Sequence, residues 1–123
     1  MMAFGDCQEC VEAIATELFR SAPMDKWEIL ELRAMRPSED RIVFTTICRV
    51  DGKARHVETS LEMSEWLDEL AQLASSPDKG LYTRLALDVT PEGDFHARYG
   101  YNAIVEDDID KMALNKLPGD FWP

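Results

Sequence analysis

Three short turns separate neighbouring strand-like runs in this chain, and they limit how its strands can pair. The turns are RPSED (36–40), the dipeptide Asp51-Gly52 and TPEGD (90–94). Asp-Gly between strand-like runs is a strong hairpin signal, and connections this short leave no room for the crossover that parallel neighbours need. The sequence therefore predicts an antiparallel sheet rather than a series of parallel βαβ units.

Five runs have the composition of strands. Residues 41–50, RIVFTTICRV, are rich in β-branched residues and apolar on both faces, which is typical of a central strand. After Gly93, the residues Phe95, Ala97 and Tyr99 alternate with His96 and Arg98, as in a half-buried strand that we expect to continue to Val105. The predicted strands cover residues 26–36, 41–50, 53–58, 81–89 and 95–105.

Two amphipathic helices are predicted from apolar residues spaced three and four apart. The first runs from Asp6 to about Arg20 and ends before Pro23. The second follows Thr59 and Glu62, which have the spacing of a capping box. Its apolar stripe consists of Met63, Trp66, Leu67, Leu70, Leu73 and Ala74. A short additional helical segment is expected over residues 110–115.

The element order α-β-β-β-α-β-β predicts an α+β fold. Each principal helix has a single apolar stripe, so both are expected to cover one face of a single antiparallel sheet of about five strands. A length of 123 residues fits one domain, 1–123. The predicted core consists of Phe44, Trp66, Leu67, Leu70, Leu73, Leu85, Leu87 and Phe95. Phe121 and Trp122 of the tail are expected to pack back onto the body.

The chain is strongly acidic, with 24 Asp and Glu against 13 Lys and Arg and a net charge of −11. This charge argues against binding nucleic acid or an anionic membrane surface. The first ten residues, MMAFGDCQEC, lack the basic and apolar regions of a signal peptide, so a cytoplasmic location is expected. The charge has two interpretations: simple solubility, or long-range attraction of a basic partner.

The sequence contains one CxxC pair, Cys7-Gln-Glu-Cys10. Both cysteines fall on the apolar stripe of the first helix, where a free cysteine acts as a small hydrophobic residue. No second paired motif accompanies them, and no βαβ unit precedes them. We therefore expect neither metal binding nor redox cycling, and no cofactor.

Motifs for catalysis are sparse. His56 and His96 lie at the alternating polar positions of predicted strands and are candidates for an acid–base pair. The sequence contains no Gly-x-Ser-x-Gly, no glycine-rich phosphate loop and no His-Glu-x-x-His. The chain is therefore not expected to be an enzyme.

Two segments carry acids with no compensating cation among them. Residues 58–78 contain six acids and no Lys or Arg, and another group of acids follows the last strand. A surface adapted only to solubility mixes both signs and gains i,i+4 pairs. The candidate partner-binding acids are therefore Glu62, Glu65, Asp68 and Glu69 in the second helix, with Glu106, Asp107, Asp108 and Asp110 after the last strand.

The order of elements and several aromatic positions resemble the YezG-type family of bacterial polymorphic-toxin immunity proteins, which includes those of contact-dependent inhibition systems. The resemblance covers most of the chain as an element order. It rests on the strand opening WEILELRAM, the stretch TPEGDFHARYGYN and the closing Phe121-Trp122. It implies a protein without catalytic activity that binds a cognate toxin domain and blocks its active site or substrate path. Many toxins of such systems are nucleases with basic clefts, which an acidic inhibitor can occupy.

Under this interpretation the segment 106–110 is the first candidate interface, because we expect it to project as a loop from the end of a rigid strand. The acidic face of the second helix is the second candidate. Interfaces often have aromatic anchors, so any exposed Tyr82, Tyr101 or Trp122 near these acids is a further candidate. The alternative function is a small enzyme or a ligand-binding α+β domain that uses His56 or His96.

Overall fold

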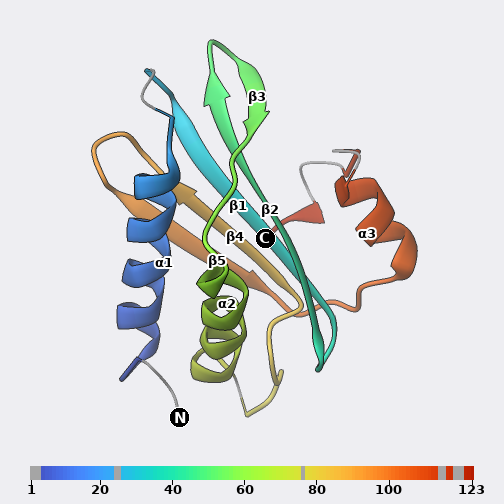
Figure 1. The fold of residues 1–123 in the computed structure, drawn as a ribbon. Coiled ribbons are helices and arrows are strands. Elements are labelled where there is room, and N and C mark those ends of the chain that lie inside the picture. The colour runs from blue at the N-terminus through green and yellow to red at the C-terminus, as the bar shows by residue number, and fades with distance from the viewer. Residues whose placement is uncertain (1–3, 24–25, 76, 114–115, 118–120) are drawn as a thin grey trace.

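The computed structural model describes residues 4–23, 26–75, 77–113, 116–117 and 121–123. Its elements are α1 (Cys7–Ser21), β1 (Ile29–Ser38), β2 (Arg41–Val50), β3 (Lys53–His56), α2 (Glu62–Leu73), β4 (Arg84–Val89), β5 (Phe95–Gly100) and α3 (Glu106–Ala113). The five strands form one sheet in the order β3-β2-β1-β4-β5, and every neighbouring pair is antiparallel (Figure 1). The predicted α+β fold with a five-stranded antiparallel sheet is confirmed.

The turns that joined the predicted strands form tight hairpins. Asp51 and Gly52 have φ values of 52° and 76°, so both central residues of the β2–β3 turn lie in the left-handed region. In the β4–β5 turn the Gly93 N–H donates to the Thr90 carbonyl at 2.9 Å, and the Thr90 N–H donates to the Asp94 carbonyl at 2.8 Å. Gly93 has a φ of 92°, which a residue with a side chain rarely adopts. These hairpins set the register of the strands beside them.

The main core lies between one face of the sheet and the helices α1 and α2, which cover that face side by side (Figure 1). Four predicted core residues, Leu67, Leu70, Leu85 and Leu87, have no exposed surface. The other four, Phe44, Trp66, Leu73 and Phe95, are only half-buried and pack against this core from its margin. The sequence therefore predicted the correct face for all eight residues, and the edges of the sheet and helices determine which of them retain exposed surface.

The opposite face of the sheet carries a second, smaller cluster formed by Met35, Ile109 and Met112. Val43, Leu117, Phe121 and Trp122 pack against it, so the expectation that the closing aromatic residues return to the body is confirmed. The prediction of helices on one face holds for α1 and α2, whereas α3 lies on the other face (Figure 1). β1 is therefore buried on both faces, since Leu32 packs in the main core and Met35 in this second cluster.

Several predicted boundaries are wrong at the ends of strands. The last strand ends at Gly100 rather than Val105, because β4 begins at Arg84, whose partner is Gly100. Within the described part of the chain, no strand lies opposite the residues that follow Gly100. The last helix begins at Glu106 rather than at residue 110, and residues 114–115 of the predicted segment lie outside the described residues. β1 and β4 begin about three residues later than predicted, and β3 ends at His56.

The predicted capping box at the start of the second helix is also wrong. Leu61 is the N-cap residue of α2, and no side chain donates or accepts a capping hydrogen bond there. The Met63 N–H instead donates to the Ser60 carbonyl at 3.2 Å, so a backbone turn begins the helix. In α1 the Asp6 carboxylate accepts from the Glu9 N–H at 2.9 Å, which is the side-chain cap that α2 lacks.

Candidate functional site

The acidic segment 106–110 is the N-terminal part of α3, not the projecting loop expected from the sequence. Glu106, Asp107 and Asp108 occupy the first turn. The Val105 N–H donates to Asp108 Oδ2 at 3.1 Å, and the Asp108 N–H donates to the Val105 carbonyl at 3.0 Å. Carboxylates in a first turn also interact favourably with the helix dipole. These like charges therefore have a structural role, which is to begin a helix.

An ion pair connects α3 to the turn between β1 and β2. Arg41 Nη1 lies 3.0 Å from Glu106 Oε1, and Glu39 and Asp40 immediately precede Arg41 in the turn. Asp110 lies one helical turn after Glu106 and therefore on the same side of α3. The acids of α3 and those of the turn are consequently neighbours in space.

A groove of about 490 Å³ lies between the same turn and α2. Its lining residues are Glu39, Asp40, Arg41, Ile42, Ser64, Glu65 and Asp68. Arg36 lies beside it with only 5% of its surface exposed. Its guanidinium donates to Asp68 Oδ1 at 2.7 Å and also to the Glu39 carbonyl, so it holds the turn against α2. The charge of Arg36 is buried, whereas 55% of the side-chain surface of Asp68 is exposed to solvent.

Together these contacts join the two acidic segments of the sequence into one surface, which we call the acidic surface. In Figure 1 the β1–β2 turn lies between α2 and α3. The acidic surface consists of Glu39, Asp40, Glu62, Glu65, Asp68, Glu106, Asp107 and Asp110. Arg41 and Lys111 also lie on it, and each is paired with an acid, Glu106 and Asp107 respectively. The acids therefore outnumber the exposed cations in this part of the described chain.

Several residues predicted to bind a partner lie elsewhere or are already engaged. Glu69 is half-buried and accepts from the Phe4 N–H at 3.1 Å, on the side of α2 that faces the N-terminal segment. Asp108 is half-buried and takes part in the cap of α3. Tyr101 packs against the main core with Lys79 Nζ 5.2 Å from its ring centre. These three residues have structural contacts of their own.

The other aromatic candidates do not lie exposed beside the acids. Tyr82 has no exposed surface, and its hydroxyl donates to the Leu67 carbonyl at 2.8 Å. Trp122 is half-buried and packs edge-to-face on Phe121, with ring centres 4.9 Å apart. The exposed apolar residues beside the acids are instead Leu61, before α2, and Val105, before α3, which are 94% and 58% exposed.

The two histidines lie on opposite edge strands of the sheet. His56 is on β3, where its Nδ1 is 3.4 Å from Thr45 Oγ1, and His96 is on β5 in register with Asp88. Three strands separate β3 from β5, so these side chains do not form an acid–base pair.

The CxxC pair begins α1 and lies against the core. Cys10 has no exposed surface, and its Sγ donates to the Trp66 carbonyl at 3.4 Å. Burial, followed by the charges of Glu69 and Cys7, raises the pKa of the Cys10 thiol to about 12. Cys7 is half-buried, with its Sγ 3.5 Å from the Tyr99 hydroxyl. Among the described residues, no three His, Cys, Asp or Glu side chains are grouped so that they could hold a metal ion.

These positions predict unequal reactivity of the thiols. In the folded protein Cys7 should react with a maleimide or a disulfide reagent at neutral pH, whereas Cys10 and Cys48 should react only as fast as the protein unfolds. The reason is that both buried thiols are inaccessible and their pKa values are raised by burial. Mass spectrometry of the labelled peptides distinguishes the sites. Equal labelling of Cys7 and Cys10 in the native state would contradict this prediction.

Sequence reasoning missed a row of ion pairs across the sheet face opposite α1 and α2. Glu31 pairs with Arg49 and lies 3.0 Å from Arg33, Arg33 lies 2.8 Å from Asp88, and Asp88 lies 3.2 Å from Arg98. Arg49 is on β2, Glu31 and Arg33 are on β1, Asp88 is on β4 and Arg98 is on β5, so the row crosses four neighbouring strands. Within each predicted strand, the sequence showed that these charged residues occupy alternate positions and so share one face. The pairing of the strands was needed to show that opposite charges meet on that face.

The end of the described chain covers part of this face. Arg84 Nη1 donates to the Phe121 carbonyl at 2.6 Å, and its guanidinium carbon lies 3.9 Å from the centre of the Phe121 ring. Arg98 Nε donates to the Pro123 carbonyl at 2.6 Å. The two arginines therefore hold residues 121–123 on the sheet through hydrogen bonds and a cation–π contact.

Comparisons with known proteins give no family assignment. No family model matches the chain, and no match was found among curated proteins. Within the described residues, no helix is both long enough and apolar enough to cross a membrane.

Proposed function

We propose that this protein is an inhibitor that binds a basic partner protein through the acidic surface, and that the partner is a bacterial toxin domain that it neutralises. The observation that supports this proposal is the joining of acids from α2, the β1–β2 turn and α3 into one exposed surface. Acids that serve only solubility need no such arrangement, whereas a partner of opposite charge is steered by the summed field of a single-sign surface.

The shape of the acidic surface fits a basic side chain of the partner. The groove between α2 and the turn is lined by Asp40, Glu65 and Asp68 together with the apolar side chain of Ile42, and Arg41, which also lines it, is paired with Glu106. A lysine or arginine can place its aliphatic stem along such an apolar side chain and its charge among carboxylates. The exposed side chains of Leu61 and Val105 add apolar contact at the two ends of the acidic surface. A nuclease domain with a basic substrate cleft has the complementary chemistry.

The alternative of a histidine-based enzyme or ligand pocket has less support. It requires His56 and His96 to act together or to line a pocket with other reactive groups. The two residues occupy opposite edges of the sheet, and His96 lines none of four grooves found on the described residues. His56 lines a groove of about 180 Å³ with Arg55 and Glu58, but Cys48, the thiol of that groove, has no exposed surface. The inhibitor is therefore the function that the arrangement of the described residues favours.

The test compares two charge-reversed variants that have the same net charge. Asp40→Lys with Glu65→Lys changes the acidic surface on both sides of the groove, and Glu92→Lys with Asp94→Lys changes the exposed β4–β5 turn at the far end of the molecule. Neither pair includes Glu106 or Asp108, which have structural contacts. Binding is measured against the toxin domain encoded beside the gene, at low and at physiological salt, with protection of cells as a second readout.

The groove variant should slow association by at least about tenfold and should lose most of its salt dependence. The turn variant should bind nearly as the wild type does, because its charges are distant from the acidic surface. Equal weakening by both variants would show that only net charge matters, and unchanged binding by both would exclude this surface. Failure of the wild-type protein to bind or to protect would refute the proposed function itself.

A further inference from the structure

The strand β5 is an outer edge of the sheet, and half of its backbone groups point away from β4. The Thr90 N–H donates to the Asp94 carbonyl and the Asp94 N–H donates to the Thr90 hydroxyl, so residues 90 and 94 direct their backbone groups toward each other across the hairpin. Because such pairs recur at every second residue of an antiparallel ladder, His96, Arg98 and Gly100 also direct their N–H and C=O groups toward β4. The N–H and C=O groups of Phe95, Ala97 and Tyr99 must then point outward. No backbone bond to them from beyond β5 is present among the described residues.

The two edges of the sheet differ in how they are protected against pairing. β3, at one edge, has four residues, all exposed, and three of them are Lys53, Arg55 and His56. Short length and charge are the usual means by which an edge strand avoids pairing with another chain. β5 has six residues without lysine, proline or acid, and its side chains toward the helices are those of Phe95, Ala97 and Tyr99. Its two basic residues, His96 and Arg98, point to the other face of the sheet, where Arg98 is paired with Asp88. The β5 edge therefore has the features of a strand that accepts a partner.

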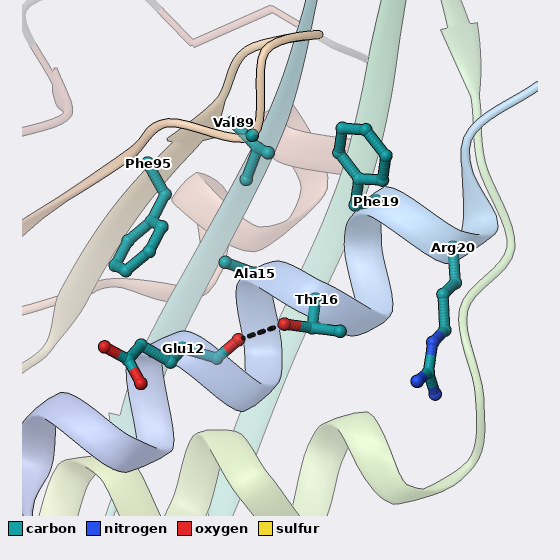
Figure 2. A pocket seen from close by; sticks show the side chains of 8 residues that line it. Glu12, Ala15, Thr16, Phe19, Arg20, Val89 and Phe95 are labelled. Carbon is teal, nitrogen blue, oxygen red and sulfur yellow. Dashed lines mark hydrogen bonds between the residues drawn. The ribbon is translucent and has the colours of Figure 1, made fainter.

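A groove of about 420 Å³ runs beside this edge, between α1 and the β4–β5 hairpin. It is lined mainly by apolar side chains, including Ala15, Phe19, Val89 and Phe95 (Figure 2). Phe19 is 43% exposed, the highest exposure of any large apolar residue in α1. Gly93 also lines the groove and has no atom within 4 Å of the position where a Cβ would lie. The groove leaves space beside β5 for the side chains of an added strand.

We propose that β5 pairs antiparallel with β5 of a second copy of this chain, which forms a dimer with one continuous ten-stranded sheet. A two-fold axis perpendicular to the sheet keeps the helices α1 and α2 of both copies on the same side. Residues that face each other must then have side chains on the same face, which restricts the register to shifts of two residues. Centring the axis on Ala97 pairs the greatest length of strand.

In this register the facing side chains are complementary on the helix side of the sheet. Phe95 lies opposite the partner's Tyr99, and Ala97 lies opposite the partner's Ala97. Aromatic cross-strand pairs of this kind are favourable. The outward groups of Phe95, Ala97 and Tyr99 form about six hydrogen bonds between the chains, two for each facing pair. Continuing the register brings the partner's Tyr101 opposite Gly93, at the groove described above.

Charge opposes this dimer and gives it a distinctive salt dependence. Each copy carries a net charge of −11, so the two chains repel. On the face away from the helices, His96 lies opposite the partner's Arg98, which adds no attraction. Salt screens such repulsion, so dimerisation should strengthen as the salt concentration rises. Binding of a basic partner to the acidic surface should respond in the opposite direction, and the two associations can therefore be distinguished.

The test is sedimentation velocity of the full chain over a wide concentration range, at low and high salt. The variant Ala97→Pro removes an outward N–H without removing any hydrogen bond to β4, because proline is tolerated where the N–H of an edge strand faces solvent. Ala54→Pro is the matched control. The Val57 N–H donates to the Thr46 carbonyl, so the N–H of Ala54 points outward from the opposite edge, β3.

We expect the wild type and Ala54→Pro to form a dimer that salt strengthens, and Ala97→Pro to raise the dimer dissociation constant by at least about tenfold. Hydrogen exchange of the wild type provides a readout without a variant: the amides of Phe95, Ala97 and Tyr99 should exchange more slowly at high protein concentration. A wild-type monomer at all concentrations would overturn the proposal. A dimer that Ala97→Pro does not weaken, or whose formation leaves these three amides unprotected, would place the interface elsewhere and overturn it equally.

Discussion

Replacing Leu70 by alanine should lower the free energy of unfolding by about 2–5 kcal/mol. Leu70 has no exposed surface and belongs to the cluster that joins α2 to α1 and the sheet. The substitution removes buried methyl groups and leaves a cavity that neighbouring strands and helices cannot close by small movements. Such a loss is a large part of the stability of a domain of this size. Urea denaturation followed by circular dichroism measures it.

The matched control for Leu70→Ala is Leu61→Ala, nine positions earlier in the chain. Leu61 is 94% exposed, so its truncation removes little buried surface and should change the free energy of unfolding by less than about 0.5 kcal/mol. Similar denaturation midpoints for Leu70→Ala and the wild type would show that the apolar stripe of α2 does not face the core. A large effect of Leu61→Ala would show instead that this side chain is covered, for example by a second molecule.

Removing the carboxylate of Asp88 should destabilise the protein by about 1–3 kcal/mol. Asp88 is the acid between two arginines, with Arg33 at 2.8 Å and Arg98 at 3.2 Å. The side chain of Arg33 is only 13% exposed, so water cannot replace the lost partner well. Asp88→Ala therefore removes the acid between Arg33 and Arg98, and Arg33 keeps only Glu31 as an acidic partner. The effect should be visible as a lower midpoint in urea.

The control for Asp88→Ala is Asp94→Ala, an exposed acid in the adjacent hairpin turn. Asp94 is not part of the row of ion pairs, and its truncation should have an effect within about 0.5 kcal/mol of zero. If both variants had the wild-type midpoint, the ion pairs across the sheet would be energetically neutral. Equal destabilisation by both would indicate a general effect of losing acids and would contradict the specific role of Asp88.

The sequence was informative wherever a local pattern controls the structure. Asp51-Gly52 predicted a hairpin because few other residue pairs adopt two successive left-handed conformations readily. The run RIVFTTICRV predicted a central strand, and β2 lies between β3 and β1 over the same ten residues. The capping prediction at Thr59 and Glu62 failed because a backbone hydrogen bond from Met63 to Ser60 begins α2, and no sequence pattern distinguishes these two ways of starting a helix.

The sequence by itself determined the class of the fold, the hairpins and the stripes that form the main core, since all of these follow from short-range periodicity and turn chemistry. The tertiary structure decided which distant charges are neighbours. It placed the β1–β2 turn between α2 and α3, which joins two acidic segments into one surface, and it connected Arg49, Glu31, Arg33 and Asp88 by ion pairs across β2, β1 and β4. It also left β5 at an edge. Strand order depends on the packing of the whole chain, and a pattern within one strand does not contain that information.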